Sequence, residues 1–207
     1  TDTSRQQIRP VAAGFEGGGF VVVWESYVFA TDEDELSAQR LDAAGNRLGD
    51  EIRIDDTEFH LHADVAIAGD GGFVVVWDDG YDVFGRRFDS AGGSIGDEFF
   101  VNDELGTMYG PRVASDASGA FVVVWEDQSE LDGDGAGVFL RRFNSDGEAL
   151  GGDIQVNSTT EGEQYAPAIG VRPDGAFVVV WESYGQSSVG DGAFGRLFES
   201  SGAPLGG

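Results

Sequence analysis

The string Phe-Val-Val-Val-Trp occurs four times, at residues 20–24, 73–77, 121–125 and 177–181, and it contains all four tryptophans of the chain. These tryptophans lie 53, 48 and 56 residues apart. A repeat length near 50 residues indicates one supersecondary unit made four times, each unable to bury its apolar surface alone. The sequence therefore predicts a repeat protein with units over about residues 8–55, 61–102, 110–157 and 166–207.

The third unit shows the expected structure of each repeat. Its predicted strands are residues 111–114, 120–126, 138–143 and 154–157, with glycine turns at 117–119 and 144–147. Four short strands joined by hairpin turns are typical of a propeller blade. Alternation along the second strand leaves both faces largely apolar, as expected where a sheet packs between two neighbours. We predict an all-β fold, a β-propeller that forms one domain over 1–207, either four-bladed or part of a larger propeller.

The fourth unit stops at Leu205-Gly206-Gly207, where its last strand should begin. Either the fourth blade has three strands, or the sequence is an excerpt of a longer chain. A missing outer strand would leave an open blade edge, and such an edge favours self-association by strand addition.

The charge excludes several partners. The 207 residues include 38 acids against 12 bases, all of them arginine, for a net charge of -26. Nucleic acids and anionic lipids bind through cationic side chains, so neither is an expected partner. No apolar run approaches the length of a membrane span, so no membrane insertion is expected. The acids indicate calcium sites, an acidic coat suited to a salty environment, or both.

One side of the propeller is expected to carry the binding groups. The first and third connections of each unit are short glycine turns, whereas the connections on the other side vary in length. Variable loops on a rigid scaffold are common binding sites. The predicted calcium ligands on this side, led by the Asp-Gly-Asp-Gly stretch at 132–135, are Asp132, Asp134, Asp127, Asp32, Asp34 and Asp191. The predicted carbohydrate-binding tyrosines, which could instead cap the blade edges, are Tyr27, Tyr81, Tyr109, Tyr165 and Tyr184.

Two further charged patterns have alternative interpretations. His60 and His62 with Asp64 could present zinc ligands on one side of a strand, although two histidines so close together are more often incidental. An acid also follows every tryptophan, and arginines recur in the third strands. They could form a ring of binding groups, but their repetition favours a structural carboxylate–guanidinium pair between adjacent strands of each blade.

The stretch Gly-Gly-Phe-Val-Val-Val-Trp-Glu-Ser at 18–26, Phe-Gly-Arg at 84–86 and 194–196, and Val-Asn at 101–102 and 156–157 carry a family resemblance. This pattern resembles the repeats found beside hemolysin-type (RTX) calcium-binding and adhesin-like modules in large secreted bacterial proteins. The resemblance covers essentially the whole chain. It implies an extracellular or cell-surface location and a calcium-rich setting, and it implies no enzyme activity and no particular binding residues.

These observations lead to one expected function and two alternatives. We expect a non-catalytic extracellular module, associated with calcium, that binds carbohydrate or a cell-surface protein through its acidic loop face. One alternative is a structural block of a giant surface protein or filament. The other is a glycan-active enzyme, because propellers host such enzymes, although no residue set recurs that singles out a catalytic pair.

Overall fold

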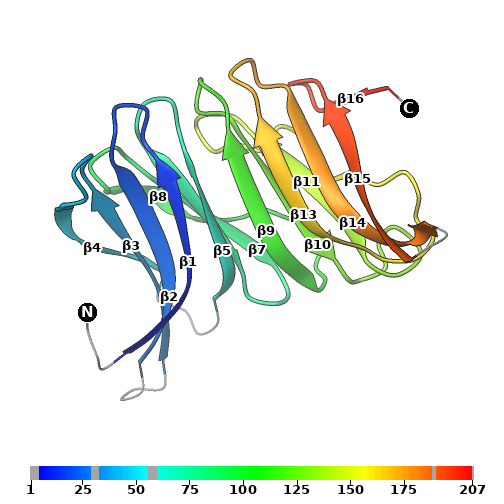
Figure 1. Cartoon of the computed structure of the whole chain (residues 1–207), viewed down its shortest axis with the longest axis horizontal. Coiled ribbons are helices and arrows are strands. Elements are labelled where there is room, and N and C mark those ends of the chain that lie inside the picture. The colour runs from blue at the N-terminus through cyan, green and yellow to red at the C-terminus, as the bar shows by residue number, and fades with distance from the viewer. Residues whose placement is uncertain (1–4, 29–32, 56–59, 188–189, 207) are drawn as a thin grey trace.

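The computed structural model describes residues 5–28, 33–55, 60–187 and 190–206, which form four four-stranded antiparallel sheets and no helix (Figure 1). The first sheet is made of β1 (Arg5–Gly14), β2 (Phe20–Val28), β3 (Glu33–Leu41) and β4 (Arg47–Asp55). The second is made of β5 (Leu61–Ile67), β6 (Phe73–Asp78), β7 (Val83–Phe88) and β8 (Ser94–Phe100). The third is made of β9 (Met108–Ser115), β10 (Phe121–Asp127), β11 (Gly137–Phe143) and β12 (Ile154–Gln155). The fourth is made of β13 (Gln164–Val171), β14 (Phe177–Ser187), β15 (Gly190–Phe198) and β16 (Pro204–Leu205). Within the described ranges, no helix is long and apolar enough to cross a membrane.

Each sheet is an up-and-down meander that begins with the same tight turn. In the second sheet, Gly71 has φ +84° and donates its N–H to the carbonyl of Ala68 at 2.9 Å. A left-handed residue at this point favours glycine. Short turns of this kind place the first and third connections of every sheet on one side, called here the turn side. The longer connections lie on the opposite side, called the loop side (Figure 1).

The second strands of the two internal sheets, β6 and β10, pack on both faces, as their sequence predicts. In β10, Phe121, Val123 and Trp125 join the apolar cluster shared with the second sheet. Val122 and Val124 join the cluster shared with the fourth sheet. Burying a large apolar side chain completely contributes roughly 1.5–3 kcal/mol. The repeated string is therefore the core that joins one sheet to the next.

The four sheets stand in a row with their first strands on the inside, as in a β-propeller. β1 packs against β5, β5 against β9 and β9 against β13, and these four first strands are called the inner strands. The first and fourth sheets lie at opposite ends of this row (Figure 1). The predicted all-β propeller architecture is confirmed.

The fourth sheet corrects one expectation. A three-stranded fourth blade was one of two alternatives, but Leu205 and Pro204 of β16 pair with Leu197 and Phe198. The outer strand is present and short, like β12 in the third sheet. An edge left open by a missing strand is therefore not a feature of this sheet.

Candidate functional site at the loop-side ends of the inner strands

Every inner strand contains an irregularity near its loop-side end. The strand pairing shifts register there in all four sheets. The residues with positive φ at this repeated position are Arg9 (48°), His62 (52°), Gly110 (56°) and Ala166 (51°). Three of these residues are not glycine, so their backbones are strained. Bulges of this kind redirect side chains and are frequent beside active sites.

In the first three sheets, the acid after the tryptophan accepts a hydrogen bond from the backbone of the bulge in the next sheet. Glu25 accepts a hydrogen bond from the backbone N–H of His62. Asp78 accepts one from Gly110 at 3.2 Å, and Glu126 accepts one from Ala166 at 3.3 Å. The predicted carboxylate–guanidinium pairing inside each blade is therefore wrong for most of these acids. Their repeated role is to satisfy a strained backbone donor in the neighbouring blade.

The repeated arginines also join neighbouring sheets, and we call them junction arginines. Arg86, Arg141 and Arg196 each donate to a backbone carbonyl of the preceding sheet. Their acceptors are Ile54 at 2.7 Å, Val101 at 3.0 Å and Val156 at 2.9 Å. Arg40, Arg87 and Arg142 each donate to a turn of the following sheet, at Ala91, Ser145 with Asp146, and Ser201. The repetition of these arginines indicated a structural role, but it did not reveal their hydrogen-bond acceptors. Every residue has a backbone carbonyl, so the sequence cannot show which one an arginine binds.

Glu25 differs from the other acids of its set. Its Oε2 accepts a hydrogen bond from Nη1 of Arg9 at 2.8 Å, and its side chain is only 8% exposed. Its Oε1 is buried and has no hydrogen-bond partner. Burial raises the pKa of this carboxyl, and the bond and charge of Arg9 only partly oppose the effect.

Asp64 is a second carboxyl with a raised pKa close to the bulge. It lies on β5 two residues beyond His62, and its Oδ2 accepts the backbone N–H of Val113 on β9 at 2.9 Å. Burial raises its pKa, while the hydrogen bond from Val113 and the charge of Arg112 favour the ionised form. Asp64 is the only acid at its position in the four repeats. It is therefore not part of the repeated framework.

The two histidines do not form the predicted zinc arrangement. Nε2 of His60 lies 2.7 Å from Asp55, whereas Nδ1 of His62 lies 3.0 Å from Asp78. The two rings thus have different carboxylate partners, and Asp64 binds the backbone of β9 instead. No group of three metal-binding side chains occurs within the described ranges.

Two of the five predicted tyrosines lie at the loop-side ends of the inner strands. Tyr109 directly precedes the bulge of β9, and its ring lies edge-on to His62 with the centroids 6.3 Å apart. Tyr165 precedes the bulge of β13 and donates its hydroxyl to Asp191 at 3.0 Å. The three others lie outside the inner strands: Tyr27 on β2, exposed Tyr81 after β6, and exposed Tyr184 on β14. Of the predicted set, the structure thus brings Tyr165 and Asp191 together, whereas Tyr109 lies beside His62.

Of the remaining predicted calcium ligands, Asp132 and Asp134 accept local hydrogen bonds. Asp132 accepts from the side-chain amide of Asn157 at 2.8 Å and from the N–H of Asp134. Asp134 accepts from the N–H of Gly162. Asp127 is buried, which raises its pKa, and Asp132 adds to the effect by charge repulsion. Asp34 lies on β3, and Asp32 lies outside the described residues. Calcium binding stays a prediction.

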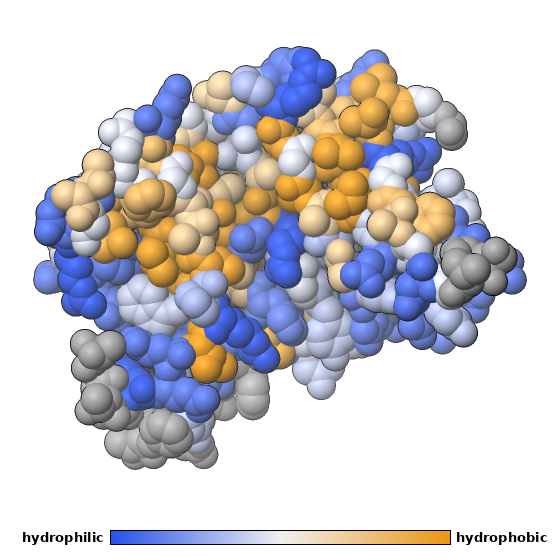
Figure 2. All heavy atoms as spheres, in the orientation of Figure 1, coloured by the Kyte–Doolittle hydropathy of each residue, from blue (hydrophilic) through white to orange (hydrophobic). Residues whose placement is uncertain are grey.

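The loop side also contains a hollow of suitable size for a small ligand. A cavity of about 360 Å³ is lined by Glu126, Gln128, Glu163 and Tyr165, among others. Figure 2 shows apolar side chains across the middle of the visible face and a mostly hydrophilic lower margin, which is the loop side of Figure 1. Polar groups that can bind and react are therefore concentrated at this end of the inner strands.

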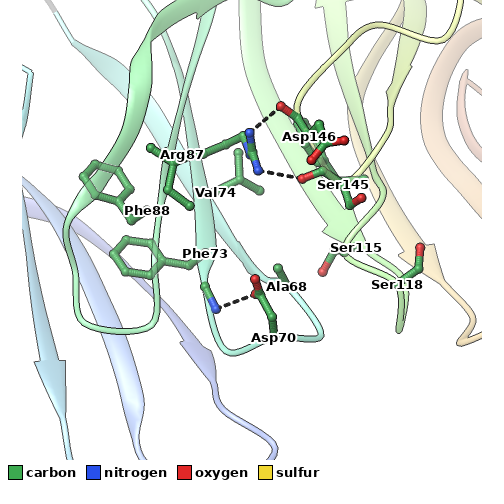
Figure 3. A pocket seen from close by; sticks show the side chains of 14 residues that line it. Ala68, Asp70, Phe73, Val74, Arg87, Phe88, Ser115, Ser118, Ser145 and Asp146 are labelled. Carbon is green, nitrogen blue, oxygen red and sulfur yellow. Dashed lines mark hydrogen bonds between the residues drawn. The ribbon is translucent and has the colours of Figure 1, made fainter.

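A second cavity of about 250 Å³ lies on the turn side between the second and third sheets (Figure 3). Arg87 crosses it to reach the carbonyls of Ser145 and Asp146, and Asp70 accepts the N–H of Gly72. These polar groups are engaged in holding the turns and the junction. The loop side therefore offers the better candidate site.

Comparison with known proteins supports the fold and corrects the expected function. No protein-family model matches the chain, and no curated protein sequence matches it. Solved structures do match. An α-L-arabinanase from Penicillium chrysogenum, complexed with arabinobiose, has a TM-score of 0.67 at 15% identity, over 92% of this chain and 62% of that one. An α-L-arabinofuranosidase from Fusarium graminearum has a TM-score of 0.63 at 10% identity, over 93% and 61%. A protein of unknown function from Dyadobacter fermentans has a TM-score of 0.68 at 11% identity, over 97% and 68%.

These matches overturn the expectation of a non-catalytic binding module. Several proteins that share the fold are named as enzymes acting on arabinose-containing glycans. The chain spans about three fifths of the length of the first two, at 62% and 61%. Sequence reasoning treated Glu25 as framework and considered Asp64 only as a zinc ligand. The available signal was asymmetry between repeats: Arg9 is the only cation at its bulge position, and Asp64 is the only acid at its own.

Proposed function

We propose that this chain is the propeller of a glycan-active enzyme that hydrolyses glycosidic bonds at the loop-side ends of its inner strands. The observation that carries the proposal is the environment of the Glu25 carboxyl. This carboxyl is buried, has a raised pKa and keeps one oxygen without a hydrogen-bond partner. A raised pKa suits a general acid for glycosidic bond cleavage, because such an acid protonates the leaving oxygen.

Hydrolysis of a glycoside also needs a second carboxylate, which activates water or attacks the sugar. We assign this role to Asp64, which lies on β5 two residues beyond the bulge at His62 and accepts the N–H of Val113; burial raises its pKa, and this hydrogen bond and the charge of Arg112 only partly oppose the effect. Asp78 is less suited, because it is fully buried and both of its oxygens already accept hydrogen bonds, from Gly80, His62 and Gly110.

Carbohydrate is the substrate class that best fits the loop-side ends of the inner strands. Tyr109 and Tyr165 are half-buried beside the bulges, where an aromatic ring can pack on the face of a sugar. The hollow of about 360 Å³ between the third and fourth sheets adds carboxylates and an amide that can accept and donate hydrogen bonds to hydroxyls. The arabinobiose complex of the Penicillium arabinanase supports arabinose-containing glycans as the first substrates to test.

The test is hydrolysis of a panel of arabinans, arabino-oligosaccharides and other plant and bacterial glycans by the purified protein. Glu25→Gln keeps the shape and the acceptor for Arg9 but removes the acid. We expect it to lower kcat by about 100- to 10,000-fold. Asp174→Asn on the turn side, where Asp174 pairs with Arg172, is the matched control and should retain full activity. Equal activity of Glu25→Gln and Asp174→Asn would refute the assignment.

A further inference from the structure

The two end sheets of the row each present an apolar face that is buried everywhere else in the molecule. On the first sheet, Phe20 is 48% exposed, whereas its counterparts Phe73, Phe121 and Phe177 are 2%, 3% and 2% exposed. On the fourth sheet, Val180 is 43% exposed, whereas its counterparts Val23, Val76 and Val124 are all at 0%. We call these surfaces the first-sheet face (Phe20, Val22, Trp24) and the fourth-sheet face (Val178, Val180, Leu197).

The three internal junctions show what covers faces of this kind. In each junction, the valines of one sheet pack against the phenylalanine and tryptophan of the next. Val21 and Val23, for example, share a cluster with Phe73, Val75 and Trp77. The fourth-sheet face is a valine face, and the first-sheet face is a phenylalanine–tryptophan face. The two exposed faces are therefore the two halves of one further junction.

The junction arginines are replaced by other residues only on these two faces. Leu197 stands where Arg40, Arg87 and Arg142 donate to a turn of the next sheet, and it is 56% exposed. The corresponding turn of the first sheet carries exposed Ala43 and Ala44, whereas the turns that accept an arginine carry Ser90, Ser145 and Ser200 at the first of these positions. An apolar side chain on one face thus matches an apolar turn on the other.

The other junction arginine is replaced in a compatible way. Gln39 of the first sheet stands where Arg86, Arg141 and Arg196 reach the preceding sheet, but its side-chain amide donates to carbonyls of its own sheet, such as that of Arg40 at 2.9 Å.

The charges near the bulges are also complementary. In the internal junctions, the acid after the tryptophan accepts the N–H of the next bulge. Glu182 of the fourth sheet is exposed, and its side chain makes no hydrogen bond or ion pair within the described part of the chain. The bulge of the first sheet carries Arg9, whose side chain is 46% exposed. Glu182 of one molecule would thus meet both the N–H and the guanidinium of Arg9 in another.

We propose that a second copy of this chain covers these faces, with the fourth-sheet face of one copy packed head-to-tail on the first-sheet face of the next. The contact would be face to face and would extend the row of blades, in contrast to strand addition at a blade edge. The inference does not depend on the proposed activity, because association is measured without substrate.

The test combines two variants, Phe20→Asp and Leu197→Asp, which place a charge on one face each at positions already half-exposed in the single chain. Sedimentation velocity and light scattering should show concentration-dependent association of the wild type. Each variant alone should associate at least about 100-fold more weakly, equivalent to roughly 2.7 kcal/mol. An equimolar mixture of the two should form dimers, because it retains one intact fourth-sheet face and one intact first-sheet face.

Leu105→Asp is the control, since Leu105 is 82% exposed but lies in the connection between the second and third sheets, outside both faces. It should associate like the wild type, and circular dichroism should show all variants folded. A wild type that stays monomeric, or a mixture that stays monomeric, would overturn the proposal. So would a Leu197→Asp variant that still associates while Phe20→Asp does not, because that result means the first-sheet face binds itself.

Discussion

Replacing Arg86 with methionine removes one hydrogen bond between two sheets while keeping most of the apolar stem of the side chain. Nη1 of Arg86 donates to the carbonyl of Ile54 at 2.7 Å, and hydrogen bonds to charged groups contribute about 1.5–3 kcal/mol. We therefore expect Arg86→Met to lower the free energy of unfolding by about 2 kcal/mol. For a chain of this length each kcal/mol shifts Tm by roughly 2–4 °C, so Tm should fall by roughly 4–8 °C.

Gln39→Met is the matched control, because Gln39 occupies the same repeat position but its amide bonds within its own sheet. Losing these neutral bonds should cost at most about 1 kcal/mol. Urea unfolding followed by tryptophan fluorescence measures both changes. The tryptophans are distributed over all four sheets, so loss of cooperativity between blades would appear as a lower m-value. Equal costs for the two substitutions would refute the view that these arginines join the blades.

Three further predictions test the core, the acids and the loops. Phe121→Ala should lower the free energy of unfolding in urea by about 3–5 kcal/mol, because Phe121 is 3% exposed and its ring stacks on that of Phe143 with the centroids 4.8 Å apart. A decrease below about 1 kcal/mol would contradict this packing. Burial raises the pKa of Glu25 above its ordinary value of 4.5, so the folded chain binds the proton of this carboxyl more tightly than the unfolded chain does. The stability contributed by the protonated carboxyl is therefore fully present below pH 4.5 and is lost as the pH rises through the folded pKa. Urea midpoints of the wild type and Glu25→Gln across this range should therefore diverge, with the variant gaining relative stability as the pH rises, and parallel curves would contradict the shift. If Asp132 belongs to a calcium site, calcium but not sodium chloride should raise Tm, and Asp132→Asn should abolish the difference; an equal rise in both salts would indicate general screening of the acidic surface.

The repeat predicted the architecture closely because it encodes both faces of every central strand. Phe121 and Val122 alternate along β10, and the structure places them in two different clusters. What the sequence could not show is which groups meet across a junction, since Arg86 and Asp78 bind backbone atoms of neighbouring blades. The short β16 was also missed, because two residues give no periodicity.

The candidate site was only partly predictable for a related reason. Tyr109, Tyr165 and Asp191 were identified because they stand on variable loops. Glu25 was assigned to the framework because an acid occurs after every tryptophan, and its distinct state depends on burial and on an oxygen without a partner. The enzymatic alternative became favoured only through the three-dimensional fold, which the resemblance to repeats of secreted proteins did not imply.

The central claim is that Glu25 makes this propeller a glycan-cleaving site. The most direct measurement is product release from arabino-oligosaccharides by the wild type and Glu25→Gln, followed by chromatography across a range of pH. We predict hydrolysis by the wild type whose rate falls at high pH as Glu25 loses its proton, and a loss of at least about 100-fold in the variant. Hydrolysis that is equal in both proteins, or absent from the wild type over the whole glycan panel, would contradict the claim.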